Sequence, residues 1–182
     1  MIRMPEFSHE LFGEYQTKSS LIIILTFVLI SGMITAFIGH DQMSDLTMLK
    51  QLVSWLIFID IAGGVVANFS RGTDRFYQQH PRKRWGFIAI HIQPILLVWS
   101  LEISMLFGFV IWLYTVTGAL LLNVIRNWDN QGLFALSLTC IGIVIVLTQA
   151  HEFSFFALVI YIFYLIKLLF SFSVVHHREV SK

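Results

Sequence analysis

Long apolar runs recur along this sequence, and they constrain its fold more than any other feature. Several runs are long enough to cross the hydrocarbon core of a membrane, which takes about 20 helical residues. The composition agrees, because 57% of the 182 residues are hydrophobic and only 13% are charged. The segments of a β-barrel would be short and alternating. We therefore expect an all-α fold, a polytopic membrane helix bundle.

The polar residues between the apolar runs predict about six transmembrane helices. The run over residues 86–125 is too long for one crossing, so we expect a turn near Glu102, with Gly108 as the alternative position. No linker divides the chain, so residues 20–175 are expected to form one transmembrane domain. The expected helices cover residues 20–39, 49–69, 85–101, 102–125, 133–149 and 153–175.

The first 19 residues precede the transmembrane domain and differ from it in character. They contain acids and a proline where a signal peptide has a basic start and an apolar core, so we expect no cleaved leader. Apolar and acidic side chains fall on opposite faces of a helix here. This pattern predicts a short interfacial helix that docks beside the basic loop at residues 71–84. Residues 176–182 are expected to form a tail.

The basic residues predict the orientation of the bundle. Most of them lie between the second and third expected helices, and such residues stay on the cytoplasmic side of short loops. Six crossings then place both termini in the cytoplasm and leave Lys50 as the only basic residue near an outer loop. We expect a protein of a bacterial cytoplasmic membrane, in contact with lipid and not with nucleic acid; a homo-oligomer remains open. The loop residues are Arg71, Arg75, Arg82, Lys83 and Arg84.

Asp60 is an acid placed near the middle of the second helix. It lies roughly 13 Å along the helix from the cytoplasmic end. A charge at that depth is costly unless it is paired, hydrated or neutralised, and such residues often mark functional sites. Asp60, Gly64 and Asn68 share one helical face that continues to Arg71. Gly63 and Gly64 would let a ligand approach the backbone, or would simply pack helices while Asp60 makes structural hydrogen bonds.

The third and sixth helices carry polar residues at a similar depth. His91 and Gln93 lie within a turn or two of the depth of Asp60, and Pro94 would loosen the helix there. A carboxylate beside an imidazole is suited to acid-base chemistry, so Asp60 and His91 are the candidate catalytic residues. Lys167 either forms an ion pair with Asp60 or extends toward the interface and leaves Asp60 free.

A ligand site is expected where the Asp60 face meets the basic loop. Arginines there could bind an anionic headgroup, although membrane topology also accounts for their charge. The candidate ligand-binding residues are Gly63, Gly64, Asn68, Arg71, Arg75, Gln93 and Lys167.

Metal and cofactor sites have little support in the sequence. Four residues at the outer ends of the helices could ligate a divalent ion, but they follow no metal-binding motif, so we expect no metal. The single cysteine excludes an intrachain disulfide. The depths of the histidines argue against a bis-histidine haem; His91 with a different second ligand stays open, and the cofactor is otherwise unknown. The four metal candidates are His40, Glu102, His151 and Glu152.

Three functions are compatible with these features. The first is a membrane protein with a buried polar pocket that opens to the cytoplasm and binds, or acts on, a lipidic or amphiphilic small molecule by acid-base chemistry. The second is a proton-coupled transporter or channel that works as an oligomer. The third is an accessory protein without catalysis, whose buried polar groups only specify packing. Enzymatic activity remains open.

Overall fold

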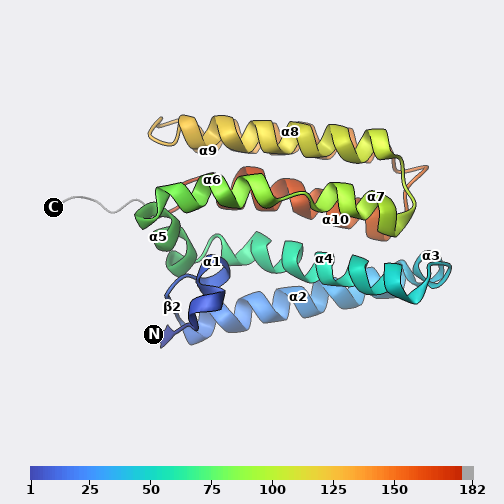
Figure 1. Ribbon diagram of the computed structural model, residues 1–182, viewed down its shortest axis with the longest axis horizontal. Coiled ribbons are helices and arrows are strands. Elements are labelled where there is room, and N and C mark those ends of the chain that lie inside the picture. The colour runs from blue at the N-terminus through green and yellow to red at the C-terminus, as the bar shows by residue number, and fades with distance from the viewer. Residues whose placement is uncertain (178–182) are drawn as a thin grey trace.

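The computed structural model describes residues 1–177, and helices make up most of them (Figure 1). Six helical segments lie side by side and alternate in direction. In chain order they are α2 (Lys18–Ile38), α4 (Met48–Ala67), α6 (Pro81–Ile90) with α7 (Gln93–Leu101), α8 (Met105–Val124), α9 (Gln131–Leu147), and α10 (Phe155–Leu165) with the π-helix η2 (Ile166–Phe172).

Five of these segments, within residues 1–177, are long and apolar enough to cross a membrane. The expected helix bundle is confirmed in this form. The exception is α9, whose 17 residues span only about 25 Å at the helical rise, compared with a hydrocarbon core of about 30 Å. The sixth crossing therefore stays a prediction.

The bundle has two distinct ends, which are named here after the short helices that lie at them. The α3 end carries α3 (His40–Ser44) and the turn at Glu102. The α5 end carries α5 (Arg71–Gln79), the N-terminal segment and the described end of the chain at His177 (Figure 1). The predicted tail begins at this end, but its residues 178–182 lie outside the described part of the chain.

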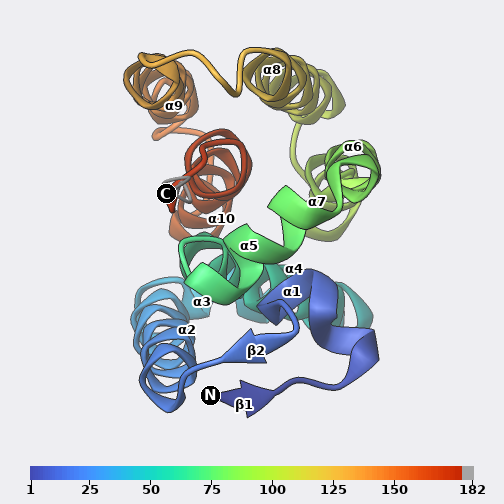
Figure 2. The same cartoon turned by 90° about the vertical axis from the view of Figure 1, so that its left-hand side faces the viewer.

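The last helical segment forms the centre of the bundle. In the end-on view, α10 lies between the α2–α4 pair and the α8–α9 pair (Figure 2), and α10 or η2 packs against all four of these helices. Its side chains Phe156, Ile160 and Leu168 are completely buried. By contrast, α2 is peripheral and exposes Leu25, Leu29 and other apolar side chains, as a lipid-facing helix does.

The turn between α7 and α8 confirms the predicted position near Glu102. Glu102 adopts a left-handed backbone conformation (φ 56°) directly after α7. Ser104 then caps α8 by accepting a hydrogen bond from the Phe107 amide at 3.4 Å. Gly108, the alternative position, lies inside α8, where a Cβ atom would approach the Pro94 carbonyl to 3.0 Å. Gly108 therefore allows α7 and α8 to pack closely.

The third transmembrane segment is broken in the middle, between α6 and α7. Pro94 lies in the first turn of α7, and a proline cannot donate the hydrogen bond that would continue the helix from α6. Two tyrosine hydroxyls of α10 donate hydrogen bonds to backbone carbonyls at the break. Tyr164 donates to the His91 carbonyl at 2.9 Å, and Tyr161 donates to the Pro94 carbonyl at 3.1 Å. The predicted loosening at Pro94 is thus confirmed as a full interruption.

The N-terminal segment differs from the interfacial helix expected there. Strand β1 (Ile2–Arg3) pairs antiparallel with β2 (Tyr15–Gln16), and only the short turns η1 (Glu6–Ser8) and α1 (His9–Phe12) are helical. Gly13 ends α1 with φ 71°, a conformation that other residues rarely adopt. The predicted short helix is thus present over residues 6–12, but it is shorter than expected because the chain turns at Gly13. Its position at a membrane interface stays a prediction.

The expected docking of this segment beside the basic residues is confirmed, although those residues do not form a loop. They lie in α5 and in the first turn of α6, with Ser70 capping α5 and Pro81 starting α6. Helix α1 packs on α5 (Figure 2), where the Tyr77 hydroxyl donates to the Glu10 carbonyl at 2.9 Å. Lys83 adds an ion pair with the Glu10 carboxylate at 3.2 Å.

Candidate functional site

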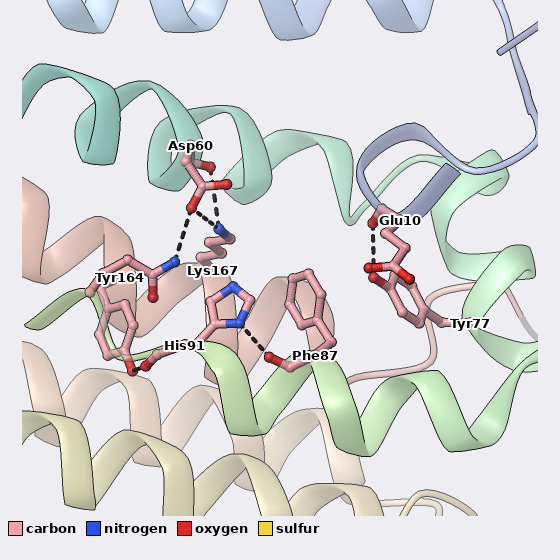
Figure 3. A network of polar contacts seen from close by, with 8 residues as sticks. Glu10, Asp60, Tyr77, Phe87, His91, Tyr164 and Lys167 are labelled. Atoms are coloured by element: carbon pink, nitrogen blue, oxygen red, sulfur yellow. Dashed lines mark hydrogen bonds and ion pairs between the residues drawn. The ribbon is translucent and has the colours of Figure 1, made fainter. Parts of the chain in front are cut away.

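One carboxylate joins three helical segments in the middle of the bundle. The Lys167 Nζ atom on η2 donates to Asp60 Oδ2 on α4 at 2.8 Å and to the Asp60 carbonyl at 3.3 Å (Figure 3). The Gln93 Nε2 atom, from the first turn of α7, donates to the same Oδ2 atom at 3.0 Å. Of the two arrangements left open for Lys167, the structure has the ion pair.

Lys167 reaches Asp60 through space that Gly64 leaves open. A Cβ atom at Gly64 would lie 2.8 Å from Cδ of Lys167 and closer still to Cε, so a larger residue here would displace the lysine side chain. A Cβ atom at Gly63 would instead face Val28 of α2, at 3.8 Å from its Cγ2 atom. The two predicted glycines therefore have separate roles: Gly64 makes room for the lysine, and Gly63 packs against a neighbouring helix.

The two partners of this ion pair differ greatly in exposure. The Lys167 side chain is 1% exposed, whereas the Asp60 side chain is 43% exposed. Apolar neighbours of Asp60 on α4, Leu56 and Ile59, are also exposed, as is Ile92 at the break between α6 and α7. The carboxylate thus opens sideways, at the apolar outer surface of the bundle, rather than toward either end.

The imidazole of His91 lies beside this pair with one nitrogen engaged and one free. Nδ1 is hydrogen bonded to the Phe87 carbonyl. A carbonyl can only accept, so Nδ1 carries the proton and Nε2 of the neutral ring is an acceptor. Nε2 is buried and has no hydrogen-bond partner within residues 1–177. Figure 3 shows the ring turned toward Lys167 and Asp60.

Further buried polar atoms lack partners within the described chain. Gln93 Oε1, on the amide whose nitrogen binds Asp60, is one of them. Asn68 Nδ2 and Ser171 Oγ, toward the α5 end, are two others. Buried polar groups are nearly always hydrogen bonded, so each of these marks a place where a water or a ligand atom would be stabilised.

Arg71 and Arg75 are not part of the site around Asp60. They line a cleft of about 1150 Å³ at the α5 end, between the N-terminal segment and α5, and His176 and His177 also line it. Asp60, His91, Gln93 and Lys167 do not. Two separate sites result: the central site, defined as Asp60, His91, Gln93 and Lys167, and the α5-end cleft, which contains Arg71 and Arg75. Asn68 lines neither of them.

Two groups near the α5-end cleft have shifted pKa values. Burial, and then the nearby Glu10 carboxylate, raise the pKa of Tyr77, so its hydroxyl remains a donor to the Glu10 carbonyl. Burial is also the main reason that the pKa of His176 is lowered, which favours its neutral form.

The four metal candidates at the α3 end do not form a ligand set: two of them have other polar partners, and two are exposed. Glu102 forms an ion pair with Lys50, and His40 lies 3.3 Å from Asp41. His151 and Glu152 are exposed in the segment before α10. Within residues 1–177, no three histidine, cysteine or acidic side chains are grouped as metal ligands would be.

Sequence reasoning missed one buried cation. The Arg84 side chain is 1% exposed, and its Nε donates to Asn123 Oδ1 at 2.9 Å. Its NH2 group donates to the Phe172 and Ser173 carbonyls at 3.3 and 3.2 Å, which ties α6 to the end of η2. In the sequence, Arg84 contributed to the predicted orientation in the same way as its exposed neighbours, because no local motif distinguishes it from Arg82.

Comparison with known proteins gives no assignment. No protein-family model, curated protein or solved structure matches this chain.

Proposed function

We propose that this is an integral membrane protein that binds the polar head of a lipidic or amphiphilic small molecule at the central site and acts on it by proton transfer. One observation carries the proposal. The His91 Nε2 atom is a buried acceptor without a partner in the described chain, and it lies beside an ion pair whose carboxylate is 43% exposed.

The unpartnered atoms indicate what the ligand would have to supply. His91 Nε2 and Gln93 Oε1 are both acceptors, and an unsatisfied buried acceptor costs about 1–3 kcal/mol. A head that donates hydrogen bonds, such as a hydroxyl or an amine, would remove that cost. The sideways exposure of Asp60 favours entry from the bilayer, with the apolar tail of the ligand left among lipids.

The chemistry would be an acid-base step on that head. Phe87 holds the proton on Nδ1, so Nε2 is the atom that would accept a proton from a ligand hydroxyl. The Asp60 carboxylate would stabilise the imidazolium that forms, whereas the Lys167 ammonium beside it would oppose that charge. Lys167 and Gln93 would keep the carboxylate oriented by donating to its Oδ2 atom.

The proposed topology has six crossings, with α9 included, in a bacterial cytoplasmic membrane. The α5 end faces the cytoplasm in this arrangement, and it carries Arg71, Arg75, Arg82 and Lys83. Single cysteines at Gln79 and Gln149, in a chain with Cys140→Ser, would test it with a membrane-impermeant thiol reagent. Labelling of Gln79→Cys from outside intact cells would refute the orientation.

Native mass spectrometry of gently extracted protein tests the ligand. We expect the wild-type chain to retain an added mass that is lost in Asp60→Asn and in His91→Ala. Asp41→Asn and His40→Ala are matched controls, because they remove an acid and a histidine that are exposed at the α3 end, and they should keep the added mass. A wild-type chain that carries no added mass would contradict the proposal.

Two other functions each draw support from a specific observation. The broken α6–α7 segment beside an ionisable pair suits a proton-coupled transporter, which would need flux driven by a pH gradient in proteoliposomes. The Asp60–Lys167 pair itself suits an accessory protein. In that case Asp60→Asn would lower stability and leave any bound mass unchanged.

A further inference from the structure

The α5-end cleft is the second candidate ligand site in the described chain. One wall is the N-terminal segment around Tyr15, Gln16 and Thr17, and the other is the start of α5 at Ser70–Gly72 together with Arg75. Its volume of about 1150 Å³ exceeds that of most small-molecule sites, which are about 300–1,000 Å³.

The two walls are held together by close backbone contacts. A Cβ atom at Gly72 would lie 3.0 Å from the Phe12 carbonyl and closer still to that of Tyr15. The Gln16 amide, which is buried, donates to the Phe12 carbonyl at 2.7 Å and to the Ser70 hydroxyl. The Thr73 hydroxyl donates to the Leu11 carbonyl at 3.1 Å. The cleft is therefore a packed feature of the fold and not a loose gap under the N-terminus.

The charges around the cleft favour an anion. Arg71 and Arg75 are four residues apart on α5, so they project from the same face, and both line the cleft. The 21-residue helix α2 also begins there, after Thr17, and helix N-termini carry a positive partial charge. Among the lining residues within the described range 1–177, Glu14 is the one acid. Paired arginines match the geometry of phosphate oxygens, which accept two parallel hydrogen bonds.

The position of the cleft relates it to the membrane surface. It reaches Ser20 in the first turn of α2, and the exposed apolar surface of that helix follows immediately with Ile22, Ile23 and Leu25. Polar side chains on the cleft thus meet exposed apolar side chains within one helical turn, an arrangement that suits the headgroup level of a bilayer.

We propose that the α5-end cleft binds a phosphate-bearing headgroup through Arg71 and Arg75, with the acyl chains of the lipid running along α2. This site is independent of the central site. Soluble phosphate offers the same chemistry without the chains, so the test has to separate the two sources.

Thermal unfolding of the purified protein in detergent provides the test, with dioctanoyl phosphatidylglycerol, dioctanoyl phosphatidylcholine and inorganic phosphate as probes. The test variant combines Arg71→Gln and Arg75→Gln. The matched control combines Arg82→Gln and Arg126→Gln, which removes the same charge at the same end but outside the cleft.

The anionic lipid should raise the Tm of the wild type and of the control, and more than phosphatidylcholine does. In the test variant its affinity should fall by about tenfold for each arginine. A rise produced equally well by inorganic phosphate, and abolished in the test variant, would support the same arginine site with a soluble ligand. Equal weakening in both double variants, or no effect of any probe on the wild type, would overturn the proposal.

Two further variants keep the test decisive. The double variant Arg71→Lys with Arg75→Lys retains the charge but not the paired hydrogen bonds. Its affinity for the anionic lipid should therefore be lower than that of the wild type and higher than that of the glutamine variant. The comparison with the wild type holds even if the glutamine variant folds poorly. Asp60→Asn should leave lipid binding at the cleft unchanged. A failure of the central-site proposal would therefore not be confused with a failure of this one.

Discussion

Removing either partner of the Asp60–Lys167 pair should cost different amounts of stability. Asp60→Asn leaves a lysine that is 1% exposed without its carboxylate, and losing one partner of a buried pair costs about 3–5 kcal/mol. The carbonyl of residue 60 still accepts from the ammonium, which lowers our expectation to about 2–3 kcal/mol. Lys167→Met leaves a carboxylate that is 43% exposed and still bound to Gln93, so we expect about 1–2 kcal/mol.

The double variant Asp60→Asn with Lys167→Met removes both charges and should be more stable than Asp60→Asn alone. A buried ion pair replaced by uncharged side chains is often close to neutral in stability. The assay is equilibrium unfolding in mixed micelles for the four proteins of this cycle. An Asp60→Asn variant less destabilised than Lys167→Met, or strictly additive effects, would refute the reasoning from unequal burial.

The ion pair between Lys50 and Glu102 provides an internal comparison for this cycle. It also connects α4 to the end of α7, but its side chains are 20% and 62% exposed. Exposed pairs contribute at most about 1 kcal/mol. The same cycle on Lys50→Met and Glu102→Gln should therefore give a clearly smaller coupling energy than the central pair.

Two further predictions concern Gly64 and Tyr77. Gly64→Ala should destabilise the protein by about 1–3 kcal/mol in thermal unfolding, because the new methyl group meets the buried Lys167 side chain. Gly63→Ala has room beside Val28, at 3.8 Å, and should be neutral or stabilising by up to about 1 kcal/mol, since alanine favours a helix more than glycine does. Equal effects of the two substitutions would contradict the packing described. The pKa of Tyr77 is raised by folding, so the stability it contributes is complete below the ordinary tyrosine pKa and is lost as the pH rises above about 10. Limited proteolysis of the N-terminal segment should accelerate above that pH in the wild type, while Tyr77→Phe should cleave faster at neutral pH and show less of this pH dependence.

The features that the sequence predicted well depend on membrane physics or on single residues. Apolar runs locate helices because backbone polar groups must be satisfied inside lipid. Pro94 indicated the break because it removes a hydrogen bond whatever surrounds it. The partner of Asp60 could be named from depth alone, since Lys167 was one of few ionisable residues at that level. The sequence could not show whether Lys167 binds Asp60 or extends to the interface, because the ion pair depends on the space that Gly64 leaves for the lysine side chain.

The features that sequence reasoning missed depend on contacts between distant segments. The close backbone contact of the N-terminal segment with α5 exists because Gly13 and Gly72 leave room for it, and 59 positions separate these residues in the sequence. The π-helix that carries Lys167 has no local signature. Arg71 and Arg75 were expected beside the Asp60 face, but α5 turns them across the end of the bundle and into a separate cleft. In each case contacts between segments far apart in the sequence decide the local structure.

The long separation of Asp60 and Lys167 in the chain has a consequence for biogenesis. Their contact joins residues 107 positions apart, so α4 is synthesised on the order of 5–20 s before its partner at a translation rate of about 5–20 residues per second. During that interval the acid has to enter the membrane without its cation, as a protonated carboxyl or while still shielded by the insertion machinery. Chains truncated before η2 should therefore insert α4 less completely than Asp60→Asn chains of the same length, because only the former hold an unpaired acid in the membrane.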